Sequence, residues 1–223
     1  MIKMVVFDMA GTTVNEDNIV YKTVQKAIND EGYDFTLEEV LTAGAGKEKL
    51  QAIKSVLALK GIQDDVLAAT MFKNFSAQLR EAYATYPVTE QPGATTLFHE
   101  LKKQGIYVVL NTGYDRQTAE SLITKIGWEK GRDLDTLVTA SDVKENRPSP
   151  DMILYAMNEL NITDPATVIK VGDSAIDIEE GKNAGCHINI GITTGAQTRE
   201  QLLAAHPAYV IDNLLEILAI VKK

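Results

Sequence analysis

The stretch Lys3-Met4-Val5-Val6-Phe7-Asp8-Met9-Ala10-Gly11-Thr12-Thr13 decides the fold of this chain. Its first half is short, apolar and β-rich, which predicts a buried strand. The strand ends at Asp8, and the residues behind it predict a tight turn whose N–H groups and hydroxyls, Thr12 among them, suit phosphate oxygens. An acid at a strand end is often only a turn or cap residue, so the meaning of Asp8 depends on the rest of the chain.

Two later segments repeat this design. Residues 106–110 form an apolar run that ends at Asn111-Thr112-Gly113, and residues 167–171 form another that ends at Gly172-Asp173-Ser174. Weaker strand patterns lie at 137–140, 187–190 and 209–211, with helical patterns at 94–104, 116–126, 151–160 and 177–184. This alternation predicts an α/β fold, a Rossmann-like parallel sheet with helices on both faces. In such sheets the ligand binds at the carboxyl ends of the strands.

Residues 15–87 break the alternation. Apolar residues recur at helical spacing in 19–30, 37–43, 49–59 and 64–83, and no strand pattern is evident among them. We therefore predict two domains. Residues 1–14 and 88–223 form the sheet-containing catalytic core, and residues 15–87 form an all-helical domain inserted after the first strand.

Composition narrows the classes of function. The net charge of −9 argues against binding nucleic acid or an anionic membrane through a broad basic surface, but not against a small anionic substrate. Cys186 is the single cysteine, so no disulfide within the chain is expected and a reducing compartment is favoured. No apolar run reaches membrane-spanning length and no signal-peptide pattern is visible, which predicts a cytoplasmic protein.

A site for phosphoryl groups needs more than one carboxylate. Asp173 and Asp177, four residues apart, add oxygens that suit Mg²⁺, and the cation would relieve the repulsion between Asp8 and an anionic phosphoryl group. Thr112 offers a hydroxyl and Arg147 a positive charge for the phosphoryl oxygens. Taken singly, Thr112 is more simply a backbone cap and Arg147 a solvated loop cation. The order in which all of them occur favours a site.

This ordered set resembles the haloacid dehalogenase superfamily, whose motifs run Asp-x-(Asp)-Gly-Thr, then Ser or Thr, then Lys or Arg, then an acidic pair. The resemblance spans the whole chain. It implies that Asp8 is the nucleophile and forms an aspartyl-phosphate, that Thr112 binds phosphate, and that Arg147 fills the basic position.

The same resemblance implies a magnesium site. Its ligands would be Asp8, the backbone carbonyl of Ala10 and Asp173, with Asp177 supporting them. The helical insertion of residues 15–87 would be the cap domain of the superfamily.

Ala10 departs from the commonest version of the first motif. Phosphatases of the superfamily have a second Asp there, which protonates the leaving alkoxide and then activates water, and an alanine cannot move a proton. The phosphonatase-like branch has Asp-x-Ala-Gly-Thr-Thr instead, and the chain is similar to it also in Thr112-Gly113-Tyr114, in Asn146-Arg147-Pro148 and in residues 169–173 and 180–185. Gly113 and Tyr114 are then expected at the substrate, although Tyr114 also fits a simple packing role.

In that branch a cap lysine forms a Schiff base with the substrate aldehyde, so the C–P bond breaks without an acid for the leaving group. Lys47 lies where the branch has Gly-x-x-Lys, which implies this role. Ala43 stands where the branch has Met, and Leu50 where it has a His that helps to deprotonate the lysine. The alternative is an exposed lysine at a helix start, similar to its neighbours Lys49 and Lys54.

The resemblance favours a magnesium-dependent hydrolase that cleaves the C–P bond of phosphonoacetaldehyde or a related small phosphonate. Two alternatives stay open. One is a phosphatase of the superfamily that acts on a small phosphomonoester without Schiff-base chemistry. The other is a catalytically silent member that acts as a binding protein. Capped members of the superfamily often pair through their caps, so the resemblance is also compatible with a homodimer.

Overall fold

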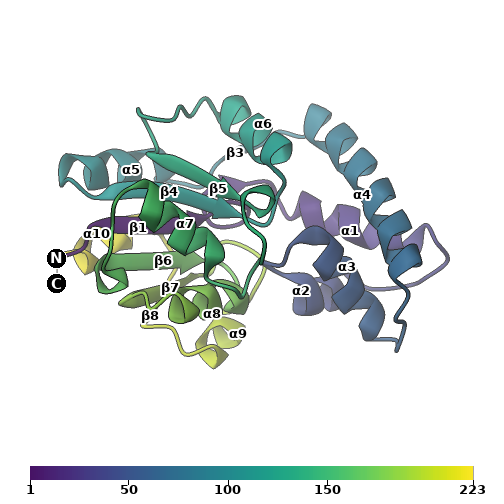
Figure 1. Cartoon of the computed structure of the whole chain (residues 1–223). Helices are drawn as coiled ribbons and strands as arrows, with labels where there is room; N and C mark the ends of the chain where they lie inside the picture. The colour runs from purple at the N-terminus through teal and green to yellow at the C-terminus, as the bar shows by residue number, and fades with distance from the viewer. Residues whose placement is uncertain (223) are drawn as a thin grey trace.

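The computed structural model describes residues 1–222 and contains one six-stranded sheet with a group of helices at one end (Figure 1). The strand order is β5-β4-β1-β6-β7-β8, and every neighbouring pair is parallel. The strands are β1 Met4–Asp8, β4 Tyr107–Thr112, β5 Thr136–Thr139, β6 Val168–Gly172, β7 Ile188–Ile192 and β8 Tyr209–Ile211. The Rossmann-like α/β fold predicted from the alternation is confirmed, with β1 inside the sheet between β4 and β6.

Alternate residues of β1 face opposite sides of the sheet, as a strand of period two requires. Val5 and Phe7 belong to one apolar cluster, and Met4 and Val6 belong to another. The first side is covered by α5 Ala94–Lys103, α6 Arg116–Ile126 and α10 Ile217–Ile220, and the second by α7 Asp151–Glu159 and α8 Ala175–Asn183. A strand with both faces buried reads as the continuous apolar run found at residues 4–7.

The remaining regular elements are short. Helix α9 (Arg199–Ala204) packs beside β7, where Leu202 lies against Gly191. Single 3₁₀ turns occur at Ala140–Asp142, Pro165–Thr167 and Leu214–Glu216.

Four helices form the insertion after β1: α1 Ile19–Asn29, α2 Leu37–Gly44, α3 Lys49–Ala58 and α4 Asp65–Thr85. Their buried faces join the same apolar cluster that covers the Val5 side of the sheet. The helix starts are fixed by side chains that accept backbone N–H groups, a capping box at Thr36 for α2, Glu48 for α3 and Asp64 for α4.

The insertion is connected to the sheet domain through a small antiparallel pair that the sequence pattern does not reveal. Strand β2 (Val14–Asn15) leads into the helices and β3 (Thr89–Glu90) leads out of them, and the two are hydrogen-bonded to each other. Two-residue strands carry no periodicity, so only their pairing in space identifies them.

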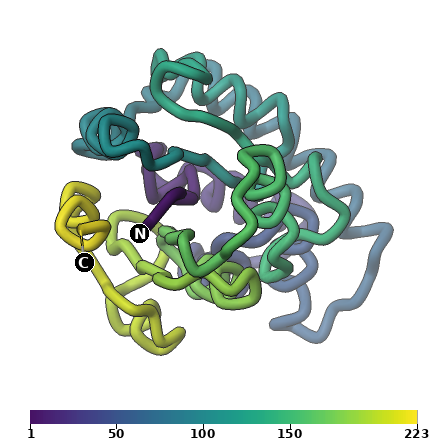
Figure 2. The backbone as a smooth tube through the Cα atoms, turned by 60° about the vertical axis from the view of Figure 1, so that its left-hand side comes forward, coloured from purple at the N-terminus to yellow at the C-terminus, as the bar shows by residue number. Residues whose placement is uncertain are grey.

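The carboxyl ends of the strands point toward the insertion. In Figure 1 β1 starts at the far end of the sheet and runs toward α1–α4, and in the turned view of Figure 2 the N-terminus faces the viewer with the insertion behind the sheet. Ligand-binding residues at the strand ends therefore lie between the two parts of the molecule. Over residues 1–222, no helix has the length and apolar character needed to cross a membrane.

A substitution of Phe98, on α5, would test the packing of this core. Its ring is fully buried, with centroids 5.4 Å from that of Phe7 and 5.1 Å from that of Trp128. We expect Phe98→Ala to lower the free energy of unfolding by about 3–5 kcal/mol, because it removes a ring that the neighbours cannot replace. Urea unfolding measures the loss. The control Val66→Ala, at a position 79% exposed, should change it by less than about 0.5 kcal/mol. Equal effects would contradict this packing.

Candidate active site

The turn after β1 brings the carboxylate of Asp8 close to the loop after β6. Gly11 takes φ +82° there, and a Cβ on it would lie 2.4 Å from Oδ2 of Asp173, so a glycine is needed both for the backbone conformation and for space. Thr13 closes the turn by donating its hydroxyl to the backbone oxygen of Asp8 at 2.8 Å. The buried Oγ1 of Thr12 has no hydrogen-bond partner within residues 1–222. A buried hydroxyl in this state suits a ligand oxygen.

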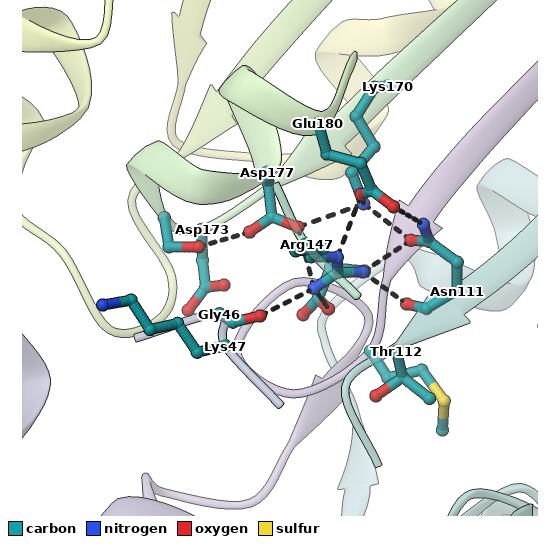
Figure 3. A network of polar contacts seen from close by, with 12 residues as sticks. Gly46, Lys47, Asn111, Thr112, Arg147, Lys170, Asp173, Asp177 and Glu180 are labelled. Atoms are coloured by element: carbon teal, nitrogen blue, oxygen red, sulfur yellow. Dashed lines mark hydrogen bonds and ion pairs between the residues drawn. The ribbon is translucent and has the colours of Figure 1, made fainter. Parts of the chain in front are cut away.

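Arg147 is the central cation of the site, and only 1% of it is exposed (Figure 3). Nη1 donates to Oδ1 of Asp8 at 2.6 Å and to the carbonyl oxygen of Gly46 at 3.4 Å. Nη2 donates to the side-chain and backbone oxygens of Asn111 at 2.7 and 2.9 Å, and Nε donates to Glu180 at 2.9 Å. All five N–H groups of the guanidinium are thus paired. The structure therefore excludes the solvated loop cation considered above.

Lys170, on β6, is a second buried cation beside Arg147. Its Nζ donates to Oδ1 of Asn111 at 2.6 Å and lies 3.0 Å from Asp177 and 3.2 Å from Glu180. Asp177 also contacts Nη1 of Arg147 at 3.0 Å and accepts a hydrogen bond from Ser174. The pKa of the Asp177 carboxyl is lowered because these two cations outweigh its burial.

Asp173, in the loop after β6, lacks such support. Its Oδ2 accepts the backbone N–H of Ala196 at 2.6 Å, and within residues 1–222 no lysine, arginine or histidine forms an ion pair with it. Burial and the charges of Asp8 and Asp177 raise the pKa of Asp173 well above its ordinary value. Burial also raises the pKa of Asp8, which Arg147 opposes. With both groups ionised, Asp8 and Asp173 would therefore carry an excess of negative charge that their cationic neighbours do not balance.

This charge excess fits a hard divalent cation. Within residues 1–222 no three His, Cys, Asp or Glu side chains are arranged as a metal-binding group. The predicted set holds two carboxylates, Asp8 and Asp173, plus the backbone carbonyl of Ala10, while Asp177 is engaged by cations. Mg²⁺ keeps several water ligands and is often held by one or two carboxylates, so this donor set is compatible with it.

The end of β4 lies beside the same turn. Thr112 is buried, and its Oγ1 accepts the backbone N–H of Tyr114 at 3.2 Å. A Cβ on Gly113 would lie 2.9 Å from the backbone oxygen of Lys47. Tyr114 is buried, and its hydroxyl lies 2.7 Å from that of Tyr83 on α4. The residues Thr112-Gly113-Tyr114 thus contact the insertion as well as the strand ends.

The loop between α2 and α3 sits directly on the core. The carbonyl oxygen of Gly46 faces Arg147, and the N–H of Gly46 donates to the hydroxyl of Tyr21 at 2.8 Å. Gly46 takes φ +73°, and a Cβ there would come within 2.3 Å of Oγ of Ser174. The backbone of this loop therefore lies close both to the loop after β6, at Ser174, and to the end of β4, at Gly113. The insertion is thus closed over the strand ends.

The lysines of this loop differ in their surroundings. Lys47 is about half-buried, and its side chain runs away from Arg147 (Figure 3), where Nζ donates to Ser55 at 2.9 Å. Lys49 is only 7% exposed, and its Nζ donates to the backbone oxygen of Lys47 at 2.6 Å. Lys49 is therefore not the exposed neighbour that the sequence suggested.

Glu16, just after β2, is a buried acid near the same lysine. Its Oε2 accepts the N–H of Val20 at 2.9 Å and the hydroxyl of Tyr83 at 3.0 Å. Burial, the largest influence, raises the pKa of the Glu16 carboxyl to about 7. Glu16, Tyr83 and Tyr114 form a buried chain of hydrogen bonds between the insertion and the core.

Sequence reasoning missed several of these residues, although signals for them exist. Lys170 and Asn111 are polar residues inside strands whose neighbours are all buried, which requires partners. Lys49 begins the spacing 49, 52, 53, 56 and 57 that defines the buried face of α3. Glu16 carries no such pattern, and only the three-dimensional structure reveals it.

Comparison with known proteins identifies the family of the chain. The family model of the haloacid dehalogenase-like hydrolases matches residues 5–190. The chain therefore belongs to this family of hydrolases, as its motifs predicted.

Individual relatives show which branch of the family the chain is similar to. A phosphonoacetaldehyde hydrolase of Latilactobacillus sakei is 29% identical over 257 residues, covering 100% of this chain and 96% of the relative. A probable phosphatase, IndB, of Dickeya dadantii is 30% identical over 216 residues, covering 96% and 91%. The similarity to the phosphonatase-like branch is thus confirmed along the whole chain.

Solved structures share the fold. A hydrolase from Pseudomonas syringae aligns with a TM-score of 0.87 at 18% identity, covering 99% of this chain and 98% of the other. A phosphonoacetaldehyde hydrolase-like protein from Oleispira antarctica aligns with a TM-score of 0.84 at 24% identity, covering 99% and 91%.

Glu16 predicts a pH dependence of stability. The folded state holds the proton of Glu16 up to about pH 7, whereas the unfolded chain releases it near 4.3. Stability contributed by this group is therefore complete below about pH 4 and is lost as the pH rises through 7, on the order of 3 kcal/mol. Glu16→Gln should remove this dependence. Urea unfolding from pH 5 to 8 measures it, and parallel curves for both proteins would contradict the assignment.

Proposed function

We propose that this chain hydrolyses a bond to phosphorus through an aspartyl-phosphate on Asp8, and that its substrate is phosphonoacetaldehyde or a related small phosphonate. The observation that carries this proposal is the pairing of two features. A carboxylate held by Arg147 ends a central strand, and Ala10 stands two residues later, where phosphatases of the family carry a proton donor. The relatives named phosphonoacetaldehyde hydrolase support the same substrate class.

Asp8 is suited to attack on phosphorus. Nη1 of Arg147 holds Oδ1, which leaves Oδ2 as the attacking oxygen and fixes the plane of the carboxylate. The free hydroxyl of Thr12 and the hydroxyl of Thr112 can hold the phosphoryl oxygens as charge moves to them. The N–H groups of residues 11–14, which the sequence also offered for this role, are instead paired with the backbone oxygens of Met9 and Val14. Water then hydrolyses the acyl phosphate, which restores Asp8 and releases phosphate.

Ala10 decides between the two classes of leaving group. A phosphomonoester leaves an alkoxide that needs a proton, and Ala10 has none to give. A C–P bond that breaks next to a protonated imine delivers its electron pair to the imine nitrogen, so no acid is required at this place. Lys47 is the lysine that the sequence assigns to the imine, and it lies on the loop that contacts Arg147.

Magnesium would be held by Asp8, Asp173 and the carbonyl of Ala10. Bound there, it would neutralise the carboxylates and the anionic phosphoryl group. The raised pKa of Asp173 supports this assignment, because a bound cation would stabilise the ionised form of a buried carboxyl that forms no ion pair within residues 1–222.

Residues 15–87 act as the cap in this proposal. The antiparallel link β2–β3 joins them to the core, and the contact between Gly46 and Arg147 would break when they open. Closure would exclude water from the imine step, during which water would hydrolyse the intermediate.

A second candidate is a phosphatase, supported by the similarity to the probable phosphatase IndB. The rates of phosphate release from different substrates distinguish the two candidate functions. We expect release from phosphonoacetaldehyde to exceed that from p-nitrophenyl phosphate and small sugar phosphates at equal concentration. Asp8→Asn should lower it by at least about 1,000-fold, because the amide is a poor nucleophile. Faster release from any phosphomonoester would favour the phosphatase, and undiminished release in Asp8→Asn would count against Asp8.

Ala10→Asp offers a sharper test. The new carboxyl would protonate an alkoxide leaving group, so phosphomonoester hydrolysis should rise by about 100-fold, while release from phosphonoacetaldehyde should not rise. The matched control is Ala10→Asn, whose side chain has nearly the same size but carries no acidic proton to donate. If both variants behave alike, the missing acid does not explain the substrate preference.

A further inference from the structure

Lys49 lies at the wall of a large cavity between the insertion and the core. The cavity measures about 690 Å³, and its lining includes Lys49, Gly113 and Tyr114 together with Phe72, Phe75 and Tyr83 of α4. Lys49 begins the buried face of α3, so the helix directs its side chain toward the core. The Nζ lies 5.5 Å from the ring centroids of both Tyr21 and Tyr114.

The contacts of Lys49 are those of an amine held without a counterion. Its one hydrogen bond is to the backbone oxygen of Lys47, and no carboxylate within residues 1–222 forms an ion pair with it. The two aromatic rings stabilise a cation only partly. Burial therefore lowers the pKa of Lys49, which favours the neutral, nucleophilic amine.

Lys47 is placed differently. Its side chain points away from the Arg147 cluster (Figure 3), and its Nζ donates to Ser55. Lys47 is not among the residues that line the cavity. Its backbone, by contrast, is part of the closed interface, because its carbonyl oxygen faces Gly113 and accepts from Lys49. In this closed arrangement Lys47 positions Lys49.

We propose that Lys49, two residues beyond the lysine that the motif indicates, is the amine that forms the imine with the carbonyl group of the substrate. This inference rests on the proposed function and names the residue that performs its second step. Tyr114 is a positioning residue whose ring fixes Nζ, and Tyr83 with Glu16 holds Tyr114 through the chain of hydrogen bonds.

The step balances without an added reagent. The Lys49 ammonium releases a proton, and the neutral amine adds to the aldehyde carbon and forms the N–C bond. The proton then assists departure of the carbonyl oxygen as water, which breaks the C–O bond and leaves a protonated imine. The C–P electron pair then moves to the imine nitrogen, giving an enamine while phosphorus bonds to Asp8. Protonation of the enamine at carbon and hydrolysis by water return the Lys49 ammonium and release acetaldehyde.

Borohydride trapping of the wild-type enzyme tests this assignment. The protein is incubated with phosphonoacetaldehyde, reduced, digested and sequenced by mass spectrometry, with fragment ions that separate Lys47 from Lys49. We expect an ethyl or phosphonoethyl group on Lys49. An adduct on Lys47 alone would overturn the inference and leave the proposed function intact. Phosphate release from phosphonoacetaldehyde no faster than from phosphomonoesters would overturn the proposed function itself.

Substitutions give a second measurement. Lys49→Arg keeps the charge but cannot form an imine, so kcat for phosphonoacetaldehyde should fall by at least about 100-fold. In Lys47→Arg, kcat should fall by less than about tenfold. The control is Lys54→Arg, at an exposed lysine of α3 that pairs with Asp65, and its kcat should equal that of the wild type. Circular dichroism checks that each variant folds. A larger loss in Lys47→Arg than in Lys49→Arg would overturn the assignment.

Substitutions of Tyr114 test its positioning role separately. Tyr114→Phe keeps the ring beside Nζ and removes the hydroxyl, so it should retain trapping at Lys49. Tyr114→Ala should lower kcat more than it raises KM. The pH profile of the trapping rate should also move in Tyr114→Ala, and the charged groups that act on Lys49 in this profile are Asp8, Glu16, Glu48 and Arg147. An unchanged profile in Tyr114→Ala would contradict this role.

Discussion

The guanidinium of Arg147 is the group on which the rest of the site depends. A buried guanidinium requires an acceptor for every N–H, because each unpaired donor would cost several kcal/mol away from water. Its acceptors come from the end of β1, the end of β4, the helix α8 and the loop of the insertion, through Asp8, Asn111, Glu180 and Gly46. One side chain thereby fixes the relative positions of four segments that are far apart in sequence.

The same cluster sets an electrostatic constraint. Two buried cations, Arg147 and Lys170, face the four buried carboxylates of Asp8, Asp173, Asp177 and Glu180. The cations lie on the side of Asp177 and Glu180, so the uncompensated charge falls on the side of Asp173. An anionic substrate approaching this edge meets repulsion unless a further cation is present. The fold thus makes substrate binding depend on metal binding, in the reaction that we propose.

Much of the fold and part of the site could be predicted from sequence. Strands buried on both faces leave continuous apolar runs, and the acids and hydroxyls that end them stand out, as at Asp8 and Thr112. Arg147 was identifiable by the order of the motifs, but its burial was not, because its partners are distant in sequence. The prediction that Lys49 is exposed was wrong. A lysine at a helix start is usually solvated, and the apolar residues that share its buried helix face follow only three or more positions later in the sequence. Glu16 gains its character from tertiary contacts alone.

The link β2–β3 has a consequence for how such an enzyme can diversify. In the function that we propose, the groups that bind phosphorus lie on the sheet domain, whereas α4 and the start of α3 contribute side chains to the cavity for the organic part of the substrate. Within residues 1–222 the chain passes between these parts only through β2 and β3, so residues such as Phe72 can change without disturbing the register of β1 or the pairing of Asp8. Gene duplication followed by drift in the insertion would then alter substrate choice while the phosphate chemistry stays the same.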